Sequence, residues 1–248
     1  MFKLMKYEFR KTWITKLILL GITAAAEIAF LISLYAEAEN TLAASIGILT
    51  LLAVFGVLVI GLQSVITLHR DMNTKQGYML FMTPNSCYKI LGAKVLENGL
   101  SILATGAFFF GLGALDITLL FAKEGQLNQV WEMIQEALRA FNEQIPLTAD
   151  ALAAYAFSLL TGWICTVVTA YLADVICAAL LNGKSYNGIV SFLFFLALTW
   201  ATGWLNGIAT RGIPNVTTSL VVQGGIALLT AAVMYVVTAQ IMEKKLSV

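Results

Sequence analysis

The sequence contains few of the residues that make a water-soluble surface. Charged residues are 12% of the 248-residue chain and hydrophobic residues are 59%. Soluble domains usually have about 25% charged and about 45–50% apolar residues. One water-soluble core cannot bury such a surplus of apolar side chains. The composition therefore excludes a soluble globular protein and indicates a polytopic membrane protein.

Residues and motifs that carry catalysis are also scarce. The single histidine, His69, excludes the HExxH pattern of zinc proteases, and no Cys/His cluster has metal-ligand spacing. The sequence has no G-x-S-x-G motif for a serine nucleophile and no G-x-x-x-x-G-K-[ST] loop for nucleotide phosphates. We therefore expect that the chain is not an enzyme by itself, that it binds no metal or cofactor, and that it has no nucleic-acid partner.

Six apolar stretches are long enough to cross a membrane, which takes roughly 20 residues of helix. They lie at about 14–35, 42–67, 97–121, 151–180, 187–207 and 217–240. The sequence therefore predicts an all-α polytopic membrane protein, in which residues 1–248 form a single transmembrane domain of six transmembrane helices.

The distribution of Lys and Arg predicts the orientation of these spans. If the amino terminus is cytoplasmic, only Lys123, Arg139 and Arg211 fall outside the cell, and the other twelve of the fifteen basic residues lie inside. This asymmetry is the one that the positive-inside rule describes. We expect a multi-pass protein of the plasma membrane with both termini in the cytoplasm and a cytoplasmic loop at 68–96.

Two amphipathic helices are expected outside the spans. Aromatic residues recur at helical spacing from Phe2 to Trp13 with cations between them, which predicts an amino-terminal interfacial helix. Residues 125–145 carry an apolar stripe that ends at Pro146, which predicts an outer amphipathic helix. The simpler interpretations are an ordinary positive-inside flank and a helix that packs on the ends of its own bundle.

The cytoplasmic loop has a distinct internal pattern, RDMNTKQGYMLFMTPNSCYKILGAKV. Pro84 is unfavourable inside a helix, so we predict a short helix at about 72–82, a break at 83–85 and a new helix that begins near Ser86 and continues into the third span. A short helix at the tip of a loop is a shape that fits a groove on a partner protein.

This loop resembles the first cytoplasmic loop of the permease (transmembrane) subunits of type-2 ABC transporters of the Gram-positive bacterial exporter type. In that family a polar start, a Gly-aromatic pair, a proline break and a Lys-containing helix follow in this order. The matching positions are Asp71, Lys75, Gly77, Tyr78, Phe81, Pro84 and Lys94. A weaker match is the short Gly-Lys turn in LLNGKSYNG, between the fourth and fifth spans.

The resemblance implies a permease subunit that pairs with a second copy or a sibling and docks on a separate cytoplasmic ABC ATPase. Residues 72–83 would be its coupling helix, and ATP and Mg²⁺ would be bound by the ATPase. The resemblance does not select the cargo, which stays open between an antimicrobial peptide, a drug, a lipid-like molecule and a polysaccharide precursor. The residues expected at the docking loop are Arg70, Asp71, Lys75, Gln76, Gly77, Tyr78, Phe81 and Pro84.

Glu27 is the acid expected deep in the membrane, where a carboxylate is costly. Either it lines the substrate path or it bonds to a neighbouring polar group such as Gln63, Thr105 or Thr161. Counted from the inner start of its span, Asp116 falls near the outer face, so no second acid is expected beside Glu27. The alternative functions are a proton- or ion-coupled carrier centred on Glu27 and a non-transporting immunity or assembly subunit.

Overall fold

The computed structural model describes residues 2–73, 86–123, 148–181 and 187–246, together with residues 125, 128, 131–133, 135, 136 and 139. This part of the chain is all-helical and contains no strand. Its helices are α1 (Phe2–Tyr35), α2 (Glu39–Asn73), α4 (Cys87–Lys123), α6 (Ala149–Leu181), α7 (Asn187–Ala209) and α8 (Val216–Leu246).

All six helices are long and apolar enough to cross a membrane, as expected of a multi-pass membrane protein. Each of the six apolar stretches predicted from the sequence lies within one of them. The all-α fold with six helices of transmembrane length is therefore confirmed for the described residues. Every helix except α7 has 31 or more residues. At a rise of about 1.5 Å per residue, these five extend beyond a hydrocarbon core of about 30 Å.

Local sequence signals mark where several of these helices begin and end. Between α1 and α2 the backbone turns at Glu37, whose φ of 55° lies in the left-handed region. The Thr148 hydroxyl accepts a hydrogen bond from Ala151 N at 3.4 Å at the start of α6, and Asn215 Oδ1 accepts one from Thr217 N at 3.0 Å at the start of α8. Both are side-chain caps of helix amino termini, which satisfy backbone N–H groups that lack an intrahelical partner.

The amphipathic helices expected outside the spans are not confirmed. Residues 2–35 form one continuous helix, so no separate interfacial helix precedes the first span. Most of the predicted outer helix at 125–145 lies outside the described residues, as does the segment 74–85 with its predicted short helix and break. The predicted new helix near Ser86 is confirmed, because α4 begins at Cys87 and runs unbroken to Lys123.

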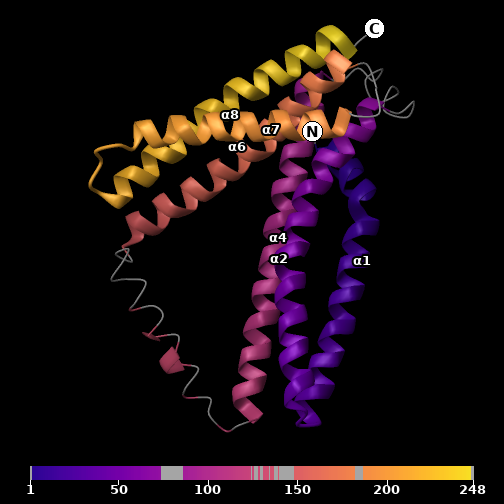
Figure 1. The fold of residues 1–248 in the computed structure, drawn as a ribbon, viewed down its shortest axis with the longest axis vertical. Helices are drawn as coiled ribbons and strands as arrows, with labels where there is room; N and C mark the ends of the chain where they lie inside the picture. The colour runs from indigo at the N-terminus through magenta and orange to yellow at the C-terminus, as the bar shows by residue number, and fades with distance from the viewer. Residues whose placement is uncertain are drawn as a thin grey trace.

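The helices form two groups of three that meet at one end (Figure 1). We call α1, α2 and α4 the N-terminal group and α6, α7 and α8 the C-terminal group. Within each group the helices pack along one another, and the two groups diverge from their meeting point like the arms of a V. The carboxyl ends of α2, α6 and α8 and the amino ends of α4 and α7 lie toward the apex.

A small buried cluster holds the two groups together at the apex. Leu68 of α2 and Leu91 of α4 pack with Tyr171 and Val175 of α6 and Met242 of α8, and all five are fully buried. A hydrogen bond from the Tyr235 hydroxyl of α8 to the Tyr88 carbonyl of α4 adds a polar link beside this cluster. The apex therefore combines apolar packing with hydrogen bonds between the two groups.

Glycine allows the closest helix approaches. A Cβ atom at Gly224 of α8 would lie 2.6 Å from a ring carbon of Phe157 on α6, closer than real Cβ atoms come. Gly61 of α2 faces the Trp163 ring of α6, where a Cβ would lie 3.1 Å away. Gly56 of α2 is similarly close to α4, where a Cβ would lie 3.0 Å from a ring carbon of Phe109, whereas a Cβ at Gly106 or Gly111 would meet nothing within 4 Å.

Candidate functional site

The predicted docking loop is described only at its two ends. Arg70 and Asp71 lie in the last turn of α2, and Lys94 lies two turns into α4. The other docking residues predicted from the sequence lie outside the described residues: Lys75, Gln76, Gly77, Tyr78, Phe81 and Pro84. At the described ends, Arg70 is exposed. Asp71 is only 6% exposed, and its carboxylate is buried within the N-terminal group.

A buried ion network joins both ends of this loop to α1. The ammonium group of Lys94, which is 1% exposed, donates to Asp71 Oδ2 of α2 and Glu8 Oε2 of α1, each at 2.8 Å. Lys11 of α1 donates to both oxygens of the same Asp71 carboxylate, at 2.8 and 2.9 Å. Two cations and two carboxylates thus balance in one network, which we call the loop-base network (Glu8, Lys11, Asp71 and Lys94).

A second polar layer lies directly beyond the first along α1 and α4. Lys16 donates to Glu97 Oε1 and to the Ser101 hydroxyl, both at 2.6 Å, and the Thr12 hydroxyl donates to Glu97 Oε1 at 3.0 Å. Glu97 is 4% exposed. Because the loop-base network and this layer together bind α1, α2 and α4 through charged groups, this end of the N-terminal group is held by directional contacts as well as by packing.

Two further polar contacts cross from the N-terminal group to the C-terminal group at the apex. His69 Nδ1 of α2 is hydrogen-bonded to Asp174 Oδ1 of α6 at 2.7 Å, and Asp174 is 2% exposed. One turn earlier on α2, the buried Ser64 hydroxyl is hydrogen-bonded to the Tyr171 hydroxyl of α6. We call these contacts, together with the buried cluster at the apex, the joint between the two helix groups. The joint lies immediately beside the loop-base network, since His69 and Asp71 are two residues apart in α2.

The expectation that Glu27 has no second acid beside it is wrong. The Glu27 carboxyl group of α1 and the Asp116 carboxyl group of α4 lie close to each other. Glu27 lies eight residues before the end of α1 and Asp116 seven before the end of α4, so each lies roughly 10–12 Å from the carboxyl end of its helix. Within the described part of the chain, Glu27 Oε2 and Asp116 Oδ1 are buried and have no hydrogen-bond partner.

The polar groups suggested as partners of Glu27 are engaged elsewhere. Gln63 donates to the Thr15 hydroxyl at 2.7 Å, and the hydroxyls of Thr105 and Thr161 donate to carbonyls of their own helices. The acid pair of Glu27 and Asp116 thus has neither a cation nor a hydroxyl donor among these candidates.

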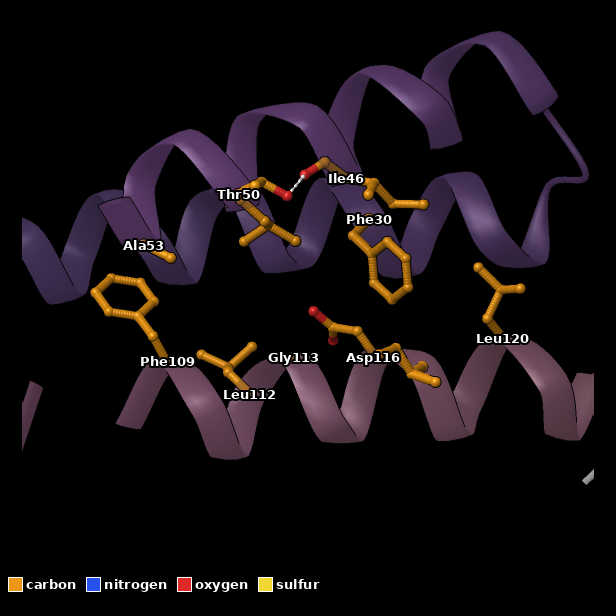
Figure 2. A pocket seen from close by; sticks show the side chains of 11 residues that line it. Phe30, Ile46, Thr50, Ala53, Phe109, Leu112, Gly113, Asp116 and Leu120 are labelled. Atoms are coloured by element: carbon orange, nitrogen blue, oxygen red, sulfur yellow. Dashed lines mark hydrogen bonds between the residues drawn. The ribbon is translucent and has the colours of Figure 1, made fainter. Parts of the chain in front are cut away.

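Next to the acid pair, a pocket of about 290 Å³ lies between α1, α2 and α4. Figure 2 shows Asp116 pointing from α4 into this space, with Phe109 and Leu112 on the same helix and Phe30 and Thr50 on the facing helices. Apart from Asp116 and Thr50, its lining is apolar. Thr50 uses its hydroxyl to donate to the Ile46 carbonyl, so Asp116 supplies the charge of the pocket.

Sequence reasoning missed the polar stripes that build the loop-base network and the polar layer beyond it, although the spacing was visible. Lys94, Glu97, Asn98 and Ser101 recur at i, i+3, i+4 and i+7, which places them on one face of α4. Polar residues on α1 recur in the same way from Glu8. The predicted interfacial helix has its cations between exposed aromatic residues, whereas Lys11 donates to the Asp71 carboxylate inside the group.

Comparison of the chain with family models, with curated proteins and with solved structures found no match. Among the described residues, no group of three or more His, Cys, Asp and Glu side chains is placed to hold a metal ion.

Proposed function

We propose that the chain is the membrane-spanning permease subunit of an ABC exporter, which couples ATP hydrolysis by a separate cytoplasmic ATPase to export. In this proposal the loop between α2 and α4 docks on the ATPase, which binds ATP and Mg²⁺. Two permeases, identical or siblings, would form the working unit in the plasma membrane with both termini in the cytoplasm. An antimicrobial peptide, a drug or a lipid-like molecule would be the cargo.

The observation that supports the proposal best is the anchoring of both ends of that loop. Asp71 precedes the loop and Lys94 follows it, and Lys94 is ion-paired both to Asp71 and to Glu8 of α1. Because both ends are fixed in one buried network, force applied to the loop would reach α1, α2 and α4 together instead of deforming the loop alone.

The position of the joint supports the same proposal. His69 and Leu68, which contact the C-terminal group, are within three residues of Asp71 on α2. A displacement of this end of α2 would therefore also act on α6 through Asp174 and Tyr171. Both helix groups would respond to one contact site, as alternating access driven from the cytoplasm requires.

Co-purification tests the docking step. The tagged chain is co-expressed with a candidate ABC ATPase and purified in mild detergent, as wild type and as Tyr78→Ala plus Phe81→Ala. We expect the wild type to capture the ATPase and the double variant to lose it. Tyr35→Ala plus Phe110→Ala is the matched control, because it also removes two aromatic side chains, which are 72% and 81% exposed and distant from the loop.

Either of two results would contradict this proposal. Capture that survives the loop substitutions would place the docking site elsewhere. No capture by the wild type in several detergents would remove the ATPase from the mechanism.

The acid pair favours a second candidate function, a proton- or cation-coupled carrier. Such a carrier usually needs more than one acidic group at membrane depth, and Asp116 supplies the second beside Glu27. If this function is correct, the chain alone in proteoliposomes conducts protons in response to a pH gradient. Glu27→Gln or Asp116→Asn would abolish the flux, while Asp150→Asn, an exposed acid at the start of α6, would not. Absence of flux from the wild type would refute it.

A further inference from the structure

We propose that the pocket between α1, α2 and α4 binds a lipophilic cation, a compact apolar molecule that carries one positive charge. Here "acid-pair pocket" means the space lined by Phe30, Phe109, Leu112, Gly113 and Asp116 with its neighbours, beside Glu27. This binding goes beyond the proposed function, because it requires neither the ATPase nor transport. The argument rests on the size, charge and aromatic lining of the pocket.

The size of the acid-pair pocket suits a small organic ligand. Its volume of about 290 Å³ lies at the lower end of the range of roughly 300–1,000 Å³ that is usual for ligand pockets. Such pockets are mostly apolar and contain a few polar groups that orient the ligand. This one is lined by apolar side chains from three helices, with Asp116 projecting into it (Figure 2).

The acidic groups at the pocket favour a ligand with a positive charge. Asp116 lines the pocket and has the Glu27 carboxyl group close to it, and none of the lining residues is basic. The lysines that flank the pair along α1 and α4 are bound elsewhere, Lys16 to Glu97 and Lys123 to the Leu34 carbonyl at 2.5 Å. In an apolar environment an ionised carboxylate needs a counter-charge. The described residues around the pair do not supply this positive charge, and a cationic ligand would.

The aromatic lining favours an organic cation over a bare metal ion. Phe30, which is 0% exposed, and Phe109 both line the space into which Asp116 points. A positive group within about 6 Å of a ring centre is attracted to the ring face, and organic ammonium or phosphonium ions also gain from the apolar surface around them. The chemistry of the pocket thus combines an anion, two rings and aliphatic walls.

Equilibrium binding of radiolabelled tetraphenylphosphonium to the purified chain in detergent tests this inference. The neutral competitor is triphenylphosphine oxide, which has similar aryl groups without the charge. The charge variant is Glu27→Gln plus Asp116→Asn, and Asp150→Asn is its control. The filling variant is Gly113→Leu, because a Cβ at Gly113 meets nothing within 4 Å and the residue lines the pocket. Gly111→Leu is the control, since it also has open space but does not line the pocket.

We expect saturable binding of tetraphenylphosphonium to the wild type, with weak competition by the neutral compound. The charge variant should bind about tenfold or more weakly, as when a partner of a desolvated charge is lost. Gly113→Leu should also lose binding, although it keeps both acids. The Gly111→Leu and Asp150→Asn controls should bind as the wild type does.

Three results would overturn the inference. They are no saturable binding by the wild type, equal binding of the neutral compound, and unchanged binding in the charge and filling variants. Because the assay contains no ATPase, no ATP and no pH gradient, failure here would leave the proposed function standing, and failure of ATPase capture would leave this site standing. Size-exclusion elution of each variant at the wild-type volume shows that it is folded.

Discussion

Replacement of Lys94 by methionine should destabilise the chain strongly, because it removes the central cation of the loop-base network. Lys94 is 1% exposed and contacts Glu8 and Asp71 at 2.8 Å each. At an effective dielectric constant of about 20, each contact is worth roughly 6 kcal/mol of Coulomb attraction. Much of this attraction offsets the cost of removing three charged groups from water.

The loss can be bounded from what remains after the substitution. Asp71 keeps Lys11 at 2.8 Å, but Glu8 keeps only a distant contact with Lys11 at 3.7 Å. Glu8 would then be a buried carboxylate that is poorly compensated. Breaking a buried pair by removing one partner costs about 3–5 kcal/mol, and the retained Lys11 places our expectation near 3 kcal/mol.

Unfolding of the purified chain in detergent, followed by tryptophan fluorescence, measures this loss. Lys89→Met is the matched control, because Lys89 lies on the same helix and is exposed, and its loss should change stability by no more than about 0.5 kcal/mol. Addition of Glu8→Gln to Lys94→Met should recover part of the stability by removing the uncompensated charge. If Lys94→Met were as stable as Lys89→Met, the reasoning that assigns the anchoring of the loop to this network would be refuted.

Two further substitutions test the packing within and between the helix groups. Gly224→Ala should destabilise by about 1–3 kcal/mol, because its methyl group would overlap the Phe157 ring, whereas Gly225→Ala has open space and should not; thermal unfolding compares the two. Tyr171→Phe removes a hydroxyl hydrogen-bonded to Ser64 across the joint and should cost about 1–3 kcal/mol, since it leaves a buried hydroxyl unpaired. The same unfolding assay checks it, and the additional change Ser64→Ala should restore most of that loss.

The fold could be predicted from the sequence because membrane-spanning helices are recognisable from the length and apolar composition of their segments. Runs of about 20 apolar residues are rare outside a bilayer, and each run found here lies in one helix. The start of α4 could also be placed near Ser86, because Pro84 prevents a helix from continuing through it. What the sequence did not predict is how the helices divide into two groups, because that depends on contacts such as Tyr171 with Leu68 and Leu91.

The acid pair was missed for a geometric reason. We counted the depth of Asp116 from the inner start of its span, and helices of unequal length do not share that reference. Counted from the carboxyl ends of α1 and α4, Glu27 and Asp116 differ by one residue. The bond from Lys123 to the Leu34 carbonyl holds those two ends level. Equal depth is not enough to predict the pair, however. Whether the two acids face each other also depends on how α1 and α4 are rotated about their axes, and the apolar periodicity of the sequence does not determine that rotation.

The polar face of α4 that takes part in the loop-base network and in the layer beyond it could have been predicted from the sequence. Lys94, Glu97 and Ser101 fall on one face of an otherwise apolar helix, and a polar stripe with that spacing predicts a partner helix that carries opposite charges. The partners could not be assigned, because Glu8 and Asp71 are 86 and 23 residues from Lys94 in the chain. Only the folded structure brings them to one place.

The measurement that tests the central claim most directly is photo-crosslinking from the loop in intact membranes. A photoreactive phenylalanine analogue replaces Tyr78 in one variant and Tyr35, at the opposite end of the N-terminal group, in another. If the loop between α2 and α4 docks on an ABC ATPase, irradiation captures the ATPase from position 78 and not from position 35. Capture from neither position, or equally from both, would contradict the assignment of this chain as a permease coupled through that loop.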